Sequence, residues 1–285
     1  MKVLIGIITR NRASLLPKAI QSALDQDFPQ KEVAVLDIAS TDETPSIQGS
    51  FPQVHWERLE ERVGIPESRN RLMSKTDATY FLSLDDDAWF LRRDEISLGA
   101  GFLEANPDFA AVAYDILLPG DKPTLGRGQP RECAIFVGCG HMLRLSDAAS
   151  IGYYAKNPTV YGGSEEMDLG LRLFGNGKKT IFLPGVHVWH ERSATGRNIQ
   201  EQFSHNLCNE FVFKVRRWPV PDVFLAVSYR LFSLLAFAVR RGRVKAYFKG
   251  MALFLGAFPK VIPSRVPLSR ASLRSFMRLK RLGPY

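Results

Sequence analysis

The sequence has few cysteines and no cysteine pattern. Its 285 residues contain three, and no two of them have C-x-x-C spacing: Cys133, Cys139 and Cys208. This argues against a disulfide framework and a structural zinc site, and it suits a reducing cytoplasm. The apolar run from Val3 to Ile8 is too short for the hydrophobic region of a signal peptide, so it predicts a first buried strand instead.

Acidic residues are almost absent from the C-terminal quarter. From Phe213 to the end there are 16 lysines and arginines and one acid, Asp222, although the whole chain has a net charge of only +9. Two runs in this part, 223–239 and 246–258, are rich in Phe, Leu and Ala and are flanked by basic clusters. The first run is slightly shorter than the roughly 20 residues of a membrane span, and Arg230 lies in its middle.

We therefore expect two parts, a globular domain over 1–212 and a helical, basic region over 213–285. Basic amphipathic helices bind anionic membrane surfaces, which predicts a peripheral location at the inner face of the cytoplasmic membrane. The alternative is a helical cap packed on the rest of the chain. Nucleic acid is not the expected partner, because the basic residues alternate with long apolar runs.

Apolar strand patterns alternate with helical patterns over the first two thirds of the chain. This alternation predicts an α/β fold with a mostly parallel, twisted sheet flanked by helices. Ligands bind such sheets at the carboxyl ends of the strands. Polar residues collect at three of these predicted ends: Thr9 to Asn11, Asp37 to Asp42, and Asp85 to Asp87.

The stretch FLSLDDDAWF, from Phe81 to Phe90, ends a predicted buried strand with three adjacent aspartates. A solvated turn is the ordinary explanation, because Asp is common in turns. The other explanation is a hard divalent cation, Mg²⁺ or Mn²⁺, held by carboxylates together with substrate phosphates. Since side chains alternate along an extended backbone, Asp85 and Asp87 would share one face and Asp86 would point away.

The order of motifs across 1–193 is more specific than any one of them. TRNR, VLDIASTDET, VGIPESRNRLM, LDDD, GCGHMLR, GGSEEMDLGLRLFGNG and VHVWHERS follow one another. This series resembles the inverting family 2 glycosyltransferases of bacterial polysaccharide or O-antigen assembly, which have the GT-A fold. The resemblance implies a metal-dependent enzyme that moves a sugar from a nucleotide-diphosphate sugar, with UDP or dTDP as the nucleotide, to a saccharide or lipid-linked saccharide.

The same resemblance implies roles for individual residues. The expected donor-nucleotide site comprises Thr9, Arg10, Asn11, Asp37, Asp42, Gly64, Arg69, Asp85 and Asp86. Metal contact is expected from Asp87 and His190, with His187 as a competing histidine in the same strand. The pattern from Ser40 to Glu43 is also a capping box, a structural reading that is compatible with nucleotide contact by Asp42.

The segment GGSEEMDLGLRL implies a catalytic base. Glu166 stands where the family has its catalytic Asp, so the carboxylate is kept and its reach grows by one carbon. Glu165 and Asp168 are the alternatives, but Asp168 and Arg172 have the i, i+4 spacing of a helical ion pair. Acids in the first turn of a helix are also favoured by its dipole, whatever their function.

The acceptor side is the least specified by the sequence. Trp89, Gly140, His141 and Glu165 are candidates, and core or turn positions explain the first three equally well. Two other functional classes remain open. A sugar nucleotidyltransferase would need an early Gly-rich phosphate loop with a Lys, which GIITRNR does not supply. A non-catalytic binding subunit is compatible with Glu in place of Asp at residue 166.

Overall fold

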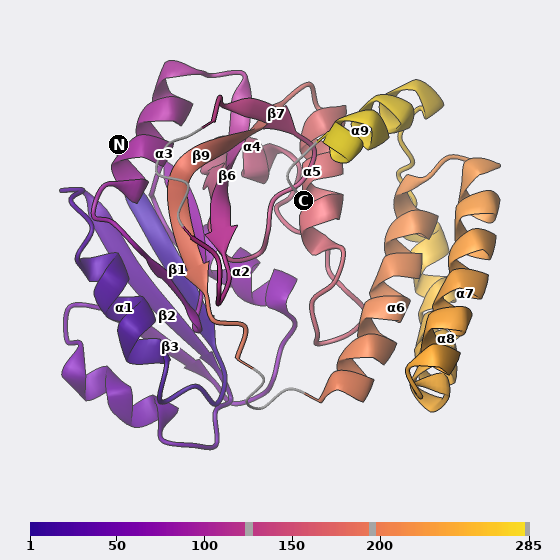
Figure 1. Cartoon of the computed structure of the whole chain (residues 1–285), viewed down its shortest axis with the longest axis horizontal. Helices are drawn as coiled ribbons and strands as arrows, with labels where there is room; N and C mark the ends of the chain where they lie inside the picture. Colours follow the sequence, from indigo (N-terminus) through magenta and orange to yellow (C-terminus); the bar gives the residue numbers. More distant parts are fainter. Residues whose placement is uncertain (123–127, 194–197, 283–285) are drawn as a thin grey trace.

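The computed structural model describes residues 1–122, 128–193 and 198–282. A nine-stranded sheet forms its centre, helices pack around the sheet, and three of the C-terminal helices stand to one side (Figure 1). The strand order is β3-β2-β1-β4-β8-β6-β9-β5, and β7 pairs with β9. The expected α/β architecture with flanking helices is confirmed.

The first four strands form a parallel half of the sheet. Their side chains are mostly buried apolar residues in the three inner strands, as expected of a sheet covered on both faces. The strands are β1 (Val3–Thr9), β2 (Lys31–Ile38), β3 (His55–Leu59) and β4 (Tyr80–Asp85). Their connections contain α1 (Leu16–Leu24), the 3₁₀ helix η1 (Thr44–Ser50) and α2 (Ile65–Ser74).

The other half of the sheet is mixed, so the expectation of a mostly parallel sheet holds only for the first half. β8 runs antiparallel to both β4 and β6, β5 and β7 run antiparallel to β9, and only β6 and β9 are parallel. Apolar patterning marks a strand but not its direction, which explains the error. The strands are β5 (Ala88–Phe90), β6 (Phe109–Leu117), β7 (Arg131–Cys133), β8 (His141–Arg144) and β9 (Lys179–His190).

Three helices support this second half: α3 (Glu95–Ala105), α4 (Leu145–Ser150) and α5 (Glu165–Gly175). α5 follows a glycine pair and turns sharply into its first residue, since Ser164 has a left-handed φ of 67°. This turn brings the acidic first turn of α5 to the carboxyl ends of β1 and β4. The two predicted acids of that turn, Glu165 and Glu166, are therefore in the helix as expected.

The C-terminal region is helical, as predicted: α6 (Ile199–Arg217), α7 (Asp222–Arg240), α8 (Val244–Val261), the 3₁₀ helix η2 (Ile262–Ser264) and α9 (Arg270–Leu282). The expected boundary after residue 212 falls inside α6, so the two parts share that helix. Helix α9 is a cap, because Leu273 and Phe276 are buried with Ala134 and Leu171 of the main body.

Helices α7 and α8 are different, because they leave large apolar side chains in solvent. They pack on α6 through one apolar cluster, which leaves Phe224, Leu225, Phe232 and Phe248 more than half exposed. Within the described part of the chain, α7 is the one helix whose length and apolar composition would allow it to cross a membrane.

Candidate functional site

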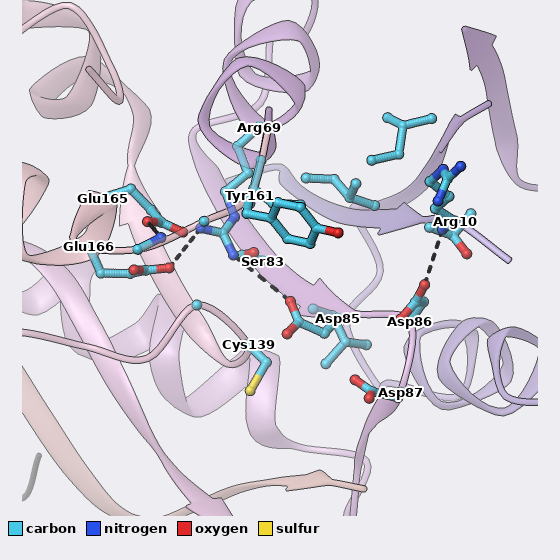
Figure 2. A pocket seen from close by; sticks show the side chains of 18 of the residues that line it. Arg10, Arg69, Ser83, Asp85, Asp86, Asp87, Cys139, Tyr161, Glu165 and Glu166 are labelled. Carbon is cyan, nitrogen blue, oxygen red and sulfur yellow. Dashed lines mark hydrogen bonds and ion pairs between the residues drawn. The ribbon is translucent and has the colours of Figure 1, made fainter. Parts of the chain in front are cut away.

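A cavity of about 390 Å³ opens at the carboxyl ends of β1 and β4. The ends of these two strands, the glycine turn before α5, the start of α6 and the end of β9 all contribute to its wall. Side chains that are far apart in the sequence face one another across it (Figure 2). Its lining includes Thr9, Arg10, Arg69, Asp85, Asp86, Asp87, Glu165, Glu166 and His190.

Asp85 and Asp87 both approach the same histidine. Nε2 of His190 lies 3.2 Å from Oδ1 of Asp87 and 3.9 Å from Oδ2 of Asp85. His190 is 8% exposed, and its Nε2 makes no hydrogen bond to any described residue. A buried imidazole nitrogen that makes no hydrogen bond but faces two carboxylates fits the ligand set of a divalent cation. The residues present therefore fit a metal such as Mn²⁺ or Mg²⁺.

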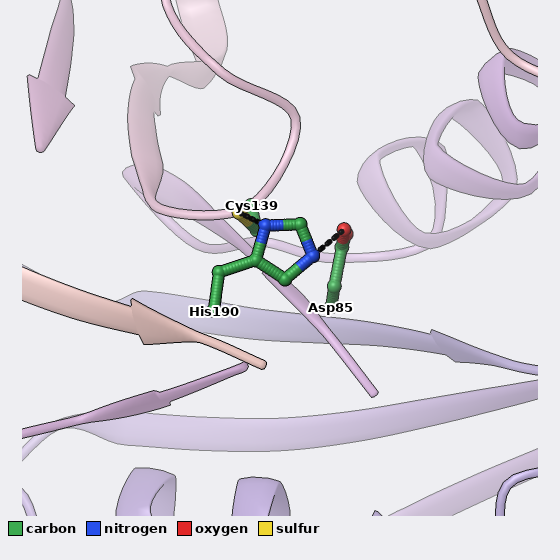
Figure 3. Close-up of side chains that lie close together, drawn as sticks. All are labelled: Asp85, Cys139 and His190. Carbon is green, nitrogen blue, oxygen red and sulfur yellow. Dashed lines mark hydrogen bonds and ion pairs between the residues drawn. The ribbon is translucent and has the colours of Figure 1, made fainter. Parts of the chain in front are cut away.

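Cys139 lies behind this histidine. Its Sγ is 3.2 Å from Nδ1 of His190, on the side of the ring opposite to Asp85 (Figure 3). One ligand atom from each of Asp85, Cys139 and His190 lies within 4.8 Å of the others. In the observed ring orientation, however, one imidazole nitrogen faces the thiol and the other faces the carboxylates. Cys139 therefore contacts and orients the imidazole and does not serve as a third ligand beside Asp85 and His190.

Asp86 points away from that pair, as predicted, although it lies in the turn between β4 and β5 and not in an extended strand. It accepts a hydrogen bond from the backbone N–H of Arg10 at 3.3 Å, and Nε of Arg12 lies 3.5 Å from its other oxygen (Figure 2). Burial raises the pKa of Asp86 to about 7, although the positive charge of Arg12 opposes the shift. Asp86 thus links the loops that follow β1 and β4.

Arg69 connects the acidic turn, by which we mean Asp85 to Asp87, to the first turn of α5. Its Nη1 lies 2.9 Å from Oε1 of Glu166, and its Nη2 lies 3.8 Å from Oδ1 of Asp85 (Figure 2). Burial by itself would lower the pKa of Arg69, but Tyr154 and Glu166 outweigh burial and raise it. The guanidinium therefore stays charged between two carboxylates from opposite sides of the cavity.

The acids of α5 have three different environments. Glu166 faces the cavity and is held by Arg69. Glu165 is buried and bonds to the backbone N–H of Gly163; burial, and then repulsion from Glu166, raises the pKa of Glu165 to about 7. Asp168 lies outside the cavity lining and is bound at 2.6–2.7 Å by Arg172 and Arg217.

The loops after β1 and β2 bond to each other. The backbone N–H of Asn11 donates to Oγ of Ser40 at 3.0 Å, and Oδ1 of Asn11 accepts from the N–H of Thr41 at 2.7 Å. Asp42, not Ser40, caps the following turn, because it accepts from the N–H of Thr44 at 3.0 Å. The Ser40–Glu43 capping box is therefore wrong: Ser40 is engaged across the loops.

Several other predicted site residues lie outside the cavity lining. Asp37 is buried and accepts from the N–H of Ser40, and Gly64 precedes the first residue of α2. Trp89 stacks on Trp189, and Gly140 bonds through its N–H to Ser83.

His187, the competing histidine, and His141, the acceptor candidate, both have partners elsewhere. His141 is fully buried between Val137 and Tyr154, and burial lowers its pKa well below the usual range. His187 lies 3.6 Å from Asp115.

Sequence reasoning missed several lining residues, among them Arg12, Cys139, Tyr161, Gln202 and Asn206. Arg12 donates to Oγ of Ser193 at 3.1 Å, and the N–H of Ser193 donates to Asp87 at 2.9 Å. These two hydrogen bonds connect Ser193, which follows β9, to Asp87 and to the loop after β1. The second Arg of TRNR was a visible signal for Arg12, whereas nothing local marks Cys139 or the two α6 residues.

In comparison with known proteins, the chain is similar to glycosyltransferases. Residues 4–136 match the model of glycosyl transferase family 2. A relative from Bacillus subtilis, named as the teichuronic acid biosynthesis glycosyltransferase TuaG, is 28% identical over 130 residues, or 43% of this chain and 51% of the relative. The chain thus spans about half the length of that protein.

Two solved structures cover almost the whole chain. A mannosyltransferase from Pyrobaculum calidifontis, PcManGT, in complex with GDP-Man and Mn²⁺ has a TM-score of 0.61 at 18% identity and covers all of this chain and 81% of that one. Residues 1–349 of TarS from S. aureus, in complex with UDP-GlcNAc, have a TM-score of 0.64 at 15% identity over 98% and 88% of the two chains. These likenesses show a GT-A fold.

Proposed function

Because residues 4–136 match the model of glycosyl transferase family 2, we propose that the chain transfers a sugar from a nucleotide-diphosphate sugar to an acceptor hydroxyl with inversion. The observation that carries this proposal is the cavity itself. A carboxylate, Glu166, and a carboxylate–histidine cluster of Asp85, Asp87 and His190 line the same space, and Arg69 contacts both Glu166 and Asp85.

Glu166 is the proposed general base. It takes the proton from the acceptor hydroxyl, whose oxygen attacks the anomeric carbon while the bond to the nucleotide diphosphate breaks. Nη1 of Arg69 lies 2.9 Å from Oε1 of Glu166 and holds the carboxylate in place. The leaving diphosphate lies toward Arg10, Arg12 and the acidic turn, where positive side chains offset its charge.

Asp85, Asp87 and His190 would hold a divalent cation, Mn²⁺ or Mg²⁺. When bound, the cation would supply positive charge to the leaving diphosphate. The hydrogen bond from the N–H of Ser193 orients the carboxylate of Asp87. A cation in a similarly folded protein supports this assignment, since the mannosyltransferase structure contains Mn²⁺.

The expected nucleotide is UDP or dTDP, and a TarS structure with UDP-GlcNAc supports the uridine case. The proposed acceptor is a saccharide or a lipid-linked saccharide of a bacterial polysaccharide. We further propose a peripheral location at the inner face of the cytoplasmic membrane. The exposed apolar side chains of α7 and α8 and the 16 basic residues after Val212 support this location.

A thermal-shift screen tests the donor site. The protein is heated with UDP, dTDP, GDP or CMP, each with Mn²⁺ or with EDTA. A ligand that binds only the folded state raises the midpoint by mass action. We expect one diphosphate nucleotide to raise the midpoint with Mn²⁺, and the shift to disappear in EDTA and in Asp87→Ala. A folded protein that responds to no nucleotide would contradict the donor site and favour a non-catalytic subunit.

A further inference from the structure

A row of residues on α6 leads from the catalytic cavity to a second cavity. Gln202 and Asn206 line the first cavity, and Glu210, Lys214 and Trp218 line the second, which has a volume of about 760 Å³. Successive members of this set are four residues apart, so they form one i, i+4 ridge that winds around α6 and ends at its C-cap residue, Trp218. This ridge runs from the first cavity to the second.

The two cavities share the turn that carries the proposed base. Glu165 and Glu166 face the first cavity, whereas Ser164 and Met167 line the second. A molecule lying in the second cavity therefore has its nearer end at the first turn of α5. We call this second cavity, which α5, α6, α7 and α9 enclose, the α6 groove.

The α6 groove carries excess positive charge. Lys214, Arg230 and Lys280 line it, together with two carboxylates. Glu210 is bound by both Lys214 and Arg230 at 2.6 Å, and Asp222 is bound by Arg270 at 2.6 Å. Nζ of Lys280 lies 3.5 Å from Sδ of Met167, and no carboxylate of the described residues lies within 4 Å of it. Burial lowers the pKa of Lys214, and the nearby charge of Lys280 adds to this shift. An anion would relieve this repulsion.

The groove also offers a hydrogen-bond donor and an apolar margin. The buried Nε1 of Trp218 makes no hydrogen bond within the described residues. Leu225 and Tyr229 line the groove from α7 and are each 72% exposed, and Phe232, one turn further on, is 68% exposed. Their spacing of four and three places them on one side of α7, so the apolar ridge begins at the cationic groove.

From this arrangement we propose that the α6 groove binds the phosphate of a lipid-linked acceptor. Its glycan extends along Asn206 and Gln202 toward Glu166, and its hydrocarbon chain lies on the Leu225–Phe232 ridge. Lys280 and Trp218 contact the phosphate. The proposal rests on the proposed function, because it assigns the acceptor of that reaction. It adds a site for the part of the acceptor that does not react.

Farnesyl pyrophosphate is a suitable probe, because it has the phosphate and the lipid without the glycan. The 285-residue protein is first saturated with UDP and Mn²⁺ so that the donor site is filled. The probe, farnesol or pyrophosphate is then titrated calorimetrically. We expect farnesyl pyrophosphate to bind about tenfold or more tightly than either fragment. Lys280→Glu should weaken it about tenfold or more, since a charge-assisted contact is lost.

The matched control is Lys245→Glu, the same change at an exposed position on α8 outside the groove. Two results would overturn the groove assignment: an equal loss of farnesyl pyrophosphate affinity in both variants, or wild-type protein that binds farnesyl pyrophosphate no more tightly than pyrophosphate. If Lys280→Glu does not fold, Tyr229→Ala at the exposed ridge replaces it, with loss of probe affinity again expected. Failure of wild-type protein to bind UDP with Mn²⁺ would instead count against the proposed function, and the probe titration without UDP would still test the groove.

Discussion

Glu166, the proposed general base, lines the cavity and is held there by Arg69. Glu166→Gln keeps the shape and removes the base, so we expect the transfer rate to fall by about 10²-fold or more. Binding of UDP with Mn²⁺ should be unchanged, because Asp85, Asp87 and His190 remain. Steady-state transfer and thermal shift, measured on the same preparation, check both expectations.

A matched change separates the base from its neighbour. Glu165→Gln alters a buried carboxyl next to Glu166 but leaves the Arg69 contact intact. Transfer should fall far less in this variant than in Glu166→Gln. A larger loss at Glu165, or none at Glu166, would show that the base is assigned to the wrong residue.

Glu165 should also make the free energy of unfolding depend on pH. Its folded pKa is raised to about 7, mainly by burial, above the usual 4.5. Its neutral form is therefore favoured in the folded state, and the stability it contributes at pH 4.5 is lost as pH rises through about 7. Urea unfolding of wild type and Glu165→Gln should diverge over this range, by up to about 3 kcal/mol. An identical pH dependence of the two proteins would contradict the buried carboxyl.

Cys139 sets the orientation of His190. Outer partners of metal-binding histidines typically change metal affinity by about 10- to 100-fold when removed. We expect Cys139→Ala, which leaves Nδ1 of His190 without its partner at 3.2 Å, to weaken Mn²⁺ binding in that range. Cys139→Ser keeps a donor and acceptor and should retain most of the affinity. Electron paramagnetic resonance titration of free Mn²⁺ measures both, and equal affinity in all three proteins would exclude this support role.

At the scale of residues, the sequence predicted the positions of site residues that belong to one continuous motif. Backbone alternation predicted a common direction for Asp85 and Asp87, and both approach His190, but Asp87 lies in the turn between β4 and β5 and not in the strand. The contact of Arg69 with Glu166 joins residues 97 positions apart, and only the resemblance to a family brought them to the same site. Cys139 stands between two glycines and has no local feature that distinguishes it from a turn residue.

At the scale of elements, Asp168 joins α5 to α6. It accepts from Arg172 of its own helix at 2.7 Å and from Arg217 near the end of α6 at 2.6 Å. Both arginines are largely buried, so Asp168→Asn would leave two cations without their carboxylate. We expect a loss of about 3–5 kcal/mol in the free energy of unfolding. Urea denaturation measures it, with Asp121→Asn on a surface loop as a control that should change little.

Helix and strand positions were largely predictable, whereas their directions and ends were not. The first three strands and α2 follow from apolar runs and turn signals near the observed bounds. The antiparallel direction of β8 depends on which neighbours it meets, and pairing is not encoded in its own four residues. The boundary placed at 212 followed a change in composition, but α6 continues to Arg217 because its next turn is buried, with Phe213 and Val215 in the core.

At the scale of the whole molecule, charge and exposed apolar surface coincide. The C-terminal quarter holds 16 basic residues and one acid, and α7 and α8 carry several of the largest exposed apolar side chains of the described residues. The tail predicted from composition therefore has two structural roles. α9 is the cap considered as an alternative, whereas α7 and α8 have the character expected of a membrane-facing pair.

Vesicle flotation tests this last property. We expect the 285-residue protein to float with vesicles containing phosphatidylglycerol and much less with phosphatidylcholine alone. Binding should weaken as salt screens the charges. Phe232→Ser and Phe248→Ser remove side chains that are 68% and 60% exposed, so each should reduce binding several-fold by loss of apolar contact. Leu98→Ser, on α3 and 43% exposed, is the matched control and should bind like wild type.

Two outcomes would contradict this expectation. Equal binding to neutral and anionic vesicles would mean that the basic residues do not contribute to membrane binding. Wild-type binding by both Phe variants would mean that α7 and α8 face something other than lipid.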